Sequence, residues 1–315
     1  MTIVTNQETG CRVEARCRVQ TRLSTTVMTT CSLYITDLDG TLLRSDASLS
    51  PFTKAVVNRL VGEGMQFTFA TARSPDKALS LLKGLDLRCP AICLNGAVVV
   101  DPLSGRWLED SSIEAEVVSR LIGAGVSGGI APFLLGENEG RDCLMYLPGG
   151  NDFQRLFIEK RAGEPRLKPS SRLSPLDKTL SVTFVGAHSR LERLSEDLHL
   201  AFADAVTLRL MRDICHEGGA TLELSGRGVD KVHRIEKLCR ELGISPSNVT
   251  VFGDHLNDLA MFRFAGTSVA VANAVPELKH EATRHCASND EEGVALYLCE
   301  AFDLDIAAIK ERSAC

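Results

Sequence analysis

The sequence is poor in aromatic residues, has no long apolar run and carries no excess of positive charge. Aromatic residues are 5% of the 315 residues, with one tryptophan at Trp107, so a stacking platform for nucleobases or sugars has little support. No stretch approaches the roughly 20 consecutive apolar residues that a membrane span needs. The net charge of −6 does not favour nucleic acid as a partner, since that requires a clustered excess of Lys and Arg. A small-molecule ligand is therefore expected.

The cysteine pattern is that of a reduced protein. Eleven cysteines occur, but they are spread through apolar segments, as at Cys215, Cys239 and Cys299, and no apolar leader segment is present. No second His or Cys stands at zinc spacing, and Cys89 with Cys93 fits a buried strand better than a ligand pair. We therefore expect a cytoplasmic protein with free thiols.

Length and texture predict two domains behind an N-terminal tail. Residues 1–30 are rich in Thr, Arg, Gln and Ser without an apolar period, which predicts a disordered tail, and Met28 is a second candidate start. From residue 31 the pattern is β-α-β-α-β, which is typical of a parallel sheet with helical crossovers. We expect an α/β core formed by residues 31–96 and 226–315. Residues 97–225, a mixed α+β segment, are expected to form an inserted cap domain that acts as a lid.

Hydrophobic periodicity and turn residues locate the elements of both parts. Core strands are expected at 33–37, 66–71, 91–95, 249–254 and 268–272, and core helices at 50–61, 74–82, 230–242, 256–262 and 291–302. In the insertion, strands are expected at 97–100, 106–109 and 180–185, and helices at 113–124, 152–161 and 190–202, with two short strands before residue 152 and two more ending at Leu224.

Two acidic motifs end predicted buried strands that lie far apart in the chain. They read Asp37-Leu38-Asp39-Gly40-Thr41 and Gly253-Asp254-His255-Leu256-Asn257-Asp258. Ligands of an open parallel sheet bind at the carboxyl ends of its strands, so the four acids are expected in one crevice. Oxygen ligands of this kind suit a hard cation such as Mg²⁺ that is shared with a phosphate. Each acid taken alone would equally fit a turn or a helix cap.

These residue types can carry out phosphate-ester chemistry. Asp37 would be the nucleophile that forms an aspartyl-phosphate, and Asp39 would protonate the leaving oxygen and then activate water. Thr71 would bind a phosphoryl oxygen, although it also fits a helix cap. Lys231 would hold the charge of Asp37 and the phosphate, the alternative being a solvated surface lysine. His255 is interpreted as a polar residue on an exposed turn.

Together the motifs resemble the haloacid dehalogenase superfamily, and specifically its Cof-type phosphatases. The further matching strings are Ala70-Thr71-Ala72-Arg73, Leu94-Asn95-Gly96-Ala97, Gly228-Val229-Asp230-Lys231, Ala272-Asn273-Ala274, and Ser288-Asn289-Asp290 with Gly293-Val294. The likeness covers residues 31 to 302. Two departures stand out: Ala72 replaces a common glycine, and Val232-His233 follows the lysine where a small residue is common.

The resemblance implies a Rossmann-like core of the haloacid dehalogenase fold with an inserted cap. It implies Mg²⁺ held by Asp37, Asp254 and the backbone carbonyl of Asp39, with Asp258 in support. It also implies that Thr71 and Lys231 bind the phosphoryl group and that Asn257 assists. The two residues expected to face the substrate or the cap are Arg73 and Asn95.

The favoured interpretation is a Mg²⁺-dependent phosphatase of small phosphorylated metabolites, with sugar phosphates as the expected class. A phosphomutase on the same scaffold is the enzymatic alternative, and a catalytically silent phosphometabolite-binding protein is the alternative from another class. Dehalogenase chemistry is disfavoured because it has no use for Mg²⁺. Arg141, Arg155 and Lys178 of the cap are candidates for meeting an anionic substrate. The sequence predicts no oligomeric state.

Overall fold

The computed structural model describes residues 32–213, 216–227 and 229–313. The predicted tail at residues 1–30 and the cysteine at 215 lie outside the described residues. Contacts group residues 31–315 into one compact unit. Within the described ranges, each helix is too short or too polar to cross a membrane.

The core is a five-stranded, fully parallel sheet in the order β14-β13-β12-β1-β2. Its strands are β1 (Leu33–Thr36), β2 (Gln66–Phe69), β12 (Val249–Gly253), β13 (Thr267–Val271) and β14 (Arg284–Cys286). A parallel bridge between Ala70 and Ile92 places β3 (Ala91–Cys93) beside β2. The predicted α/β core with a parallel sheet is confirmed.

The strand register decides which loops meet. Thr36, the last residue of β1, is paired with Phe252 of β12 and with Phe69 of β2. The residues that follow these three strands therefore leave the sheet at the same edge. Both acidic motifs and the threonine after β2 start from this edge.

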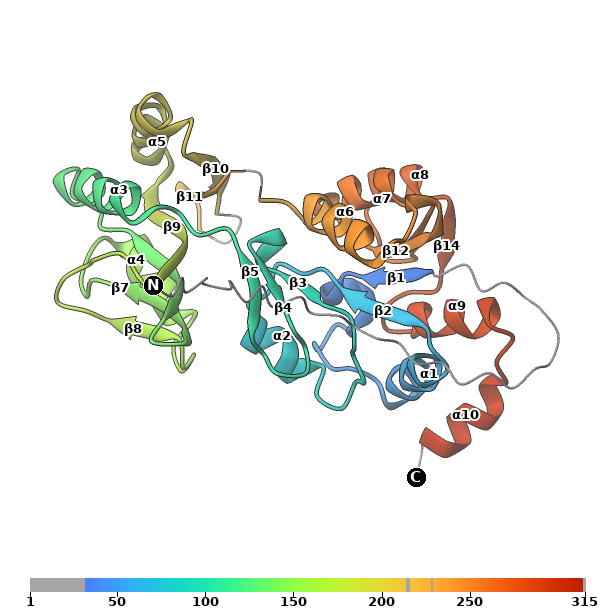
Figure 1. Cartoon of the computed structure of the whole chain (residues 1–315). Helices are drawn as coiled ribbons and strands as arrows, with labels where there is room; N and C mark the ends of the chain where they lie inside the picture. Colours follow the sequence, from blue (N-terminus) through green and yellow to red (C-terminus); the bar gives the residue numbers. More distant parts are fainter. Residues whose placement is uncertain (1–31, 214–215, 228, 314–315) are drawn as a thin grey trace, which may run out of the picture. The chain divides into compact units, whose positions relative to one another are not determined.

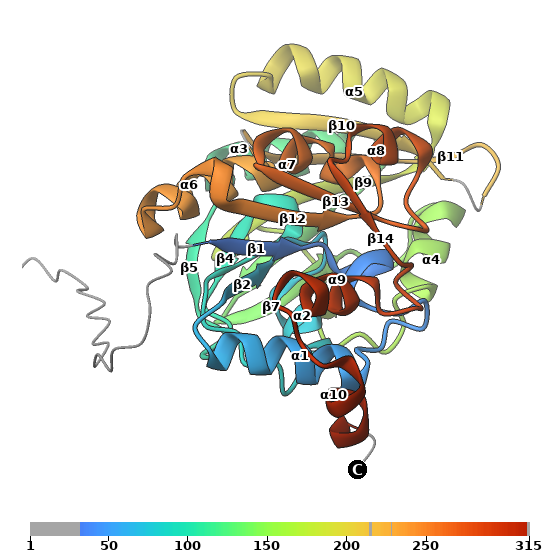
Figure 2. The same ribbon diagram turned by 90° about the vertical axis from the view of Figure 1, so that its right-hand side faces the viewer.

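Helices cover both faces of the sheet (Figures 1 and 2). On one face lie α6 (Lys231–Leu242), α7 (Leu259–Phe264) and α8 (Pro276–Glu281), and on the other lie α1 (Pro51–Gly62) and α9 (Gly293–Ala301). A short helix, α2 (Pro75–Leu81), follows β2, and α10 (Ile306–Ser313) contacts α1. The Ser50 hydroxyl caps α1 by accepting from the Thr53 N–H at 2.9 Å, as its position before Pro51 predicts.

A small antiparallel sheet extends the core. It consists of β3, β4 (Val98–Val100) and β5 (Trp107–Asp110). Val98 and Val100 are fully buried in the same hydrophobic cluster as the parallel strands. We therefore propose that the inserted cap begins after β5 and not at residue 97.

The insertion is built on a six-stranded sheet in the order β10-β11-β9-β6-β7-β8. Its elements are α3 (Ala115–Ser127), β6 (Phe133–Asn138), β7 (Arg141–Tyr146), α4 (Asp152–Glu159), β8 (Leu167–Pro169), β9 (Lys178–Ala187), α5 (His188–Phe202), β10 (Val206–Arg212) and β11 (Gly219–Gly226). Val182 and Phe184 of β9 pack in one cluster with α3 and α5, whereas Val185 packs with α4 in another. The two clusters lie on opposite faces, because side chains alternate along a strand.

Short elements account for most differences from the sequence-based expectation. The predictions contained no β8, β14, α8 or α10, each too short or too weakly periodic to stand out. The helix expected at 256–262 is a tight turn over Leu256–Asp258 followed by α7. The closing helix begins at Gly293, because Glu292 has a left-handed backbone with φ of 64°.

One glycine of the cap sheet is required by close backbone packing. A Cβ atom on Gly136 would lie 1.8 Å from the carbonyl oxygen of Lys178, where β6 shifts register against β9. We expect Gly136→Ala to lower the free energy of unfolding by about 1–3 kcal/mol. Gly62→Ala, at the open end of α1 with no atom near its Cβ, is the control and should be neutral or stabilising. Urea unfolding of both variants checks this, and equal stabilities would contradict it.

Candidate active site

A buried lysine joins two carboxylates at the sheet edge. The Lys231 Nζ donates to Asp37 Oδ1 at 2.6 Å and to Asp258 Oδ1 at 2.7 Å. The three side chains are 3%, 8% and 0% exposed. Asp230 caps α6 by accepting from the His233 N–H at 2.8 Å, so the lysine is the first residue of that helix. Lys231 is therefore not a solvated surface lysine.

Three acids surround one point at this edge. Oxygens of Asp37, Asp254 and Asp258 all lie within 4.8 Å of one another. Asp258 is fully engaged, since its Oδ2 accepts from the backbone N–H groups of Asp254 at 3.2 Å and His255 at 3.4 Å. Thr41 donates to Asp254 Oδ1 at 3.2 Å. The second oxygens of Asp37 and Asp254 accept no hydrogen bond from the described residues.

The crowding of acids shows in their pKa values. Burial raises the pKa of Asp37 to about 7, and Asp258 and Asp254 add to the rise while Lys231 opposes it. Burial and then Asp258 also raise the pKa of Asp254. Burial works against the charge of Lys231, but Asp37 and Asp258 outweigh it and raise its pKa. One ammonium facing three carboxylates leaves negative charge that a bound cation would balance.

The turn after β1 is held by residues that follow β13 and β14. Gly40 has φ of +74°, and a Cβ there would lie 2.5 Å from Asp254 Oδ2, so only glycine fits. The Asn273 amide donates to the Gly40 carbonyl at 2.7 Å, and the Asn289 N–H donates to Asn273 Oδ1 at 3.0 Å. These asparagines belong to strings that carried only the family resemblance, and the structure gives them a positioning role.

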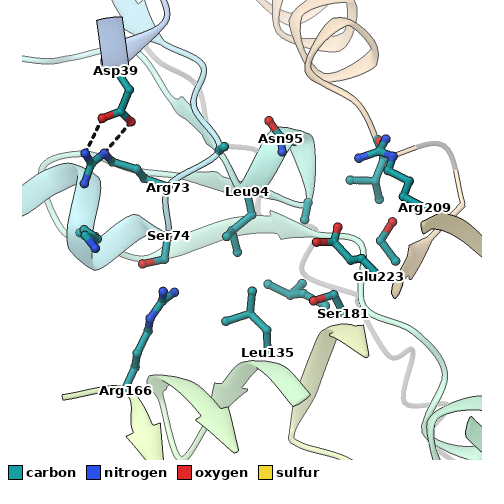
Figure 3. Close-up of a pocket in the computed structure, with 16 residues that line it drawn as sticks. Asp39, Arg73, Ser74, Leu94, Asn95, Leu135, Arg166, Ser181, Arg209 and Glu223 are labelled. Carbon is teal, nitrogen blue, oxygen red and sulfur yellow. Dashed lines mark hydrogen bonds and ion pairs between the residues drawn. The ribbon is translucent and has the colours of Figure 1, made fainter. Parts of the chain in front are cut away.

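Asp39 does not point into the acidic cluster but forms an ion pair with Arg73 (Figure 3). Arg73 Nε donates to Asp39 Oδ2 at 2.7 Å, and Nη2 donates to Oδ1. The Arg73 N–H donates to the buried Thr71 hydroxyl at 3.2 Å, which leaves the hydroxyl proton of Thr71 free for another acceptor. Ala72 has no left-handed φ, so its methyl group does not prevent this arrangement.

A strained turn supports this loop. Leu94, Asn95 and Gly96 have φ of 50°, 53° and 102°. The Leu94 N–H donates to the Arg73 carbonyl at 3.0 Å, and the Asn95 N–H donates to the Thr71 carbonyl at 2.9 Å. Leu94 and Asn95 are consecutive non-glycine residues with a left-handed backbone. Such a conformation stores strain, which is typical of functional sites. The Asn95 Oδ1 is buried, with no hydrogen-bond partner among the described residues.

A cavity of about 390 Å³ opens beside these groups, between core and cap strands (Figure 3). The core side includes Asp39, Arg73 and Asn95. The cap side includes Leu135, Arg166, Ser181, Arg209 and Glu223. None of the candidates Arg141, Arg155 and Lys178 lines this cavity, and Lys178 instead pairs with Asp110 at 3.3 Å. No sequence pattern pointed to Arg209 and Glu223, which are neighbours across β10 and β11.

The remaining predicted residues lie as follows. Asn257 is exposed beside Asp258, and His255 is exposed as expected. His233 is exposed and paired with Asp230 at 2.8 Å, so it lies outside the cavity. Cys93 is a buried residue of β3, as expected, whereas Cys89, also buried, precedes that strand.

Comparisons with known proteins identify the family to which the chain is similar. A family model described as haloacid dehalogenase-like hydrolase matches residues 34–298. An HMP-PP phosphatase from Serratia proteamaculans is 28% identical over 267 residues, which covers 83% of this chain and 92% of that protein. The 5-amino-6-(5-phospho-D-ribitylamino)uracil phosphatase YitU from Bacillus subtilis is 27% identical over 281 residues, which covers 86% and 98%.

Solved structures are similar over nearly their whole length. A haloacid dehalogenase-like hydrolase from Bacteroides thetaiotaomicron has a TM-score of 0.71 at 22% identity, covering 86% of this chain and 99% of that one. A protein from Thermotoga maritima has a TM-score of 0.68 at 26% identity, covering 85% and 96%.

Removing the buried cation should be costly. Lys231→Met leaves Asp37 and Asp258 without a counter-charge, so we expect the free energy of unfolding at neutral pH to fall by about 3–5 kcal/mol. Lys237→Met is the matched control on the same helix, where the lysine is half-exposed and pairs with Glu109 at 2.6 Å. That change should cost at most about 1 kcal/mol. Urea unfolding in the presence of a chelator measures both, and a similar small loss in the two variants would contradict the buried-triad interpretation.

A half-buried acid of the cap predicts a pH dependence. Burial raises the pKa of Asp142 on β7 to about 6, with Asp76 adding and Ser74 opposing. Its Oδ2 is buried without a hydrogen-bond partner among the described residues. Between about pH 4 and 6 the folded state then binds a proton that the unfolded state has lost, so stability falls as pH rises.

Asp142→Asn should therefore be more stable than wild type at pH 7.5, by about 1–2 kcal/mol after allowance for solvent contact, and equal to it near pH 4. Asp197→Asn, on the exposed face of α5, is the control and should follow wild type throughout. Thermal unfolding across this pH range is the measurement. An Asp142→Asn advantage that does not change with pH would show that the cause is not titration.

Proposed function

Because the chain belongs to the haloacid dehalogenase-like hydrolase family, we propose that it is a Mg²⁺-dependent phosphatase of small phosphorylated metabolites that works through an aspartyl-phosphate at Asp37. One observation carries the proposal. Asp37 is held by Lys231 through one oxygen, while its other oxygen accepts no hydrogen bond from the described residues. Such a carboxylate is oriented and still available as a nucleophile.

The donor set fits a hard divalent cation. The free oxygens of Asp37 and Asp254 are hard ligands. These two residues would hold the ion, together with the Asp39 carbonyl that the family resemblance implies. Asp258 has both oxygens engaged by Lys231 and by backbone N–H groups, so we assign it a supporting role. When bound, Mg²⁺ would offset the negative charge of the acids and of the phosphoryl oxygens.

The chain's own residues then account for both half-reactions. Asp37 attacks phosphorus, and a bond from its oxygen to phosphorus forms as the bond to the ester oxygen breaks. Asp39 gives a proton to the leaving oxygen, and in the second step it takes one from the water that attacks the aspartyl-phosphate. Thr71 donates its hydroxyl proton to a phosphoryl oxygen, and Lys231 holds the charge of Asp37. We assign Asn257, which lies in the turn after β12, the assisting role that the family resemblance implies.

Arg73 controls when Asp39 can act. Both oxygens of Asp39 accept from Arg73, so delivery of a proton to the leaving oxygen requires this ion pair to open and Asp39 to take up a proton from solvent first. The pair is reached by solvent, since the Asp39 side chain is 51% exposed, and such ion pairs open at low cost. Substrate entry between Arg73 and the cavity would release Asp39 toward the leaving oxygen.

The lining of the cavity supports a hydroxylated leaving group. No aromatic side chain lines it, while Asn95, Ser181 and Glu223 offer polar groups. The similar proteins named above act, by their names, on HMP-PP and on a phosphoribitylamino-uracil. We therefore propose sugar or polyol phosphates, or metabolites that carry such a chain, as substrates.

Phosphate release tests the proposal. Sugar phosphates, nucleotides and an aryl phosphate are assayed with Mg²⁺ and with chelator. We expect chelator-sensitive activity that Asp37→Asn lowers by about a thousandfold or more, because the amide is nearly isosteric but a poor nucleophile. Asp86→Asn, at a half-exposed acid paired with Arg88, is the control and should keep full activity.

Three results would overturn the proposal. Near-normal release by Asp37→Asn would exclude the covalent mechanism. Transfer of the phosphoryl group to a second hydroxyl would identify a mutase, and substrate binding without any turnover would identify a silent binding protein.

A further inference from the structure

A second cavity continues the first one into the cap. Its volume is about 400 Å³, and it shares the lining residues Leu135, Arg166, Ser181 and Glu223 with the cavity beside Asp39. Asp39 lines the first cavity only. The two cavities therefore adjoin each other. Asp39 lies at the end of the first cavity, and the second cavity extends away from it.

The second cavity is positively charged in a negatively charged protein. Its lining includes Lys160, Arg161, Arg166 and Arg212, against the carboxylates of Asp213 and Glu223. The whole chain carries a net charge of −6. Cations gathered in one cavity of such a protein favour an anionic ligand there.

Arg161 is the best-positioned of these cations. It is half-buried, with its guanidinium carbon 3.5 Å from the centroid of the Phe157 ring, and its Nη1 donates to the Phe157 carbonyl at 2.9 Å. It forms no ion pair with a carboxylate among the described residues. Burial lowers its pKa, and Arg166 adds to this while Glu164 opposes it.

Arg166 stands between the two cavities. Its Nε donates to Glu164 Oε2 at 2.8 Å, and Glu164 is also engaged by Lys77 at 3.5 Å. Asp142 is a second acid whose charge acts on Arg166. Arg161, which has no carboxylate partner among the described residues, still offers a planar fork that an anion can satisfy through paired hydrogen bonds. Glu223, opposite Arg209 in the sheet, can meanwhile accept from hydroxyl groups in the middle of a ligand.

We propose that the second cavity binds a second anionic group, a phosphate or carboxylate at the far end of the substrate from the phosphate that is hydrolysed. The inference rests on the proposed function and narrows it. The preferred substrates are elongated and doubly anionic, with a polar chain that lies along Ser181 and Glu223 between the two charged ends.

Two measurements test this. The first compares kcat/KM for phosphate esters of alkanediols of increasing length, each as the monophosphate, as the bisphosphate and as the ester whose far end is a carboxylate. The second measures by calorimetry the affinity of the matching monophosphonates and bisphosphonates, which cannot turn over. An aryl phosphate reports basal activity throughout.

The variants are Arg161→Gln and Arg212→Gln. Arg212 is exposed, so its replacement leaves the packing of Phe157 intact. Arg120→Gln is the matched control, because Arg120 also stacks on a phenylalanine, Phe202, at 4.6 Å, but lines neither cavity. We expect a doubly anionic ester of one length to exceed its monophosphate by roughly tenfold or more. That advantage should fall severalfold in Arg161→Gln and Arg212→Gln and persist in Arg120→Gln.

The result decides between the two kinds of doubly anionic substrate and separates failure of this inference from failure of the proposed function. An advantage of the bisphosphate alone assigns the cavity to phosphate, and an advantage of the carboxylate ester alone assigns it to carboxylate. No advantage at any length, or one that both variants retain, overturns the inference even when the aryl phosphate is hydrolysed. If no ester is hydrolysed, the phosphatase proposal fails, and the calorimetric difference between bisphosphonate and monophosphonate still tests the cavity.

Discussion

The candidate active site, at the carboxyl ends of the core strands, depends on one buried ammonium group between two carboxylates. Lys231 bonds both Asp37 and Asp258 while almost no solvent reaches any of the three. An ion in such a place costs several kcal/mol of desolvation unless its partners are well placed. The lysine therefore requires that the ends of β1 and β12 and the start of α6 meet within a hydrogen-bond length. With Asp254 nearby, the group still has excess negative charge and cannot favour a phosphate dianion until a cation is present.

The parallel register is what makes this meeting possible. β1 is the central partner of both β2 and β12, so loops from three distant parts of the sequence leave the sheet together. The core then fixes each loop by short contacts. Asn273 holds the Gly40 carbonyl, and the turn at Asn95 holds the Thr71 carbonyl. Chemistry is thus placed on rigid strand ends, which suits a covalent mechanism that needs precise alignment.

The sequence predicted the parts of this arrangement that follow from strand ends. A buried strand followed by acids carries its own signal, so Asp37, Asp254 and the parallel sheet could be anticipated. The pairing of Asp39 with Arg73 could not be anticipated, because both side chains had plausible partners elsewhere. Only the path of the loop after β2 brings the two side chains together. The cap was harder still. Arg209 and Glu223 sit in ordinary alternating strands, and nothing local separates a residue that faces a cavity from one that faces solvent.

The two kinds of cation suit the two parts of the proposed reaction. Lys231 is a compact charge buried on the first turn of a core helix, where it meets groups that every phosphate ester shares. Arg161 and Arg166 of the cap carry planar guanidinium groups. In the proposed reaction they meet the leaving group, which is the part of the substrate that differs between esters. A change in the cap can therefore alter which leaving group is accepted while the phosphoryl site stays as it is. The similar phosphatases, whose names give different substrates, are consistent with this division.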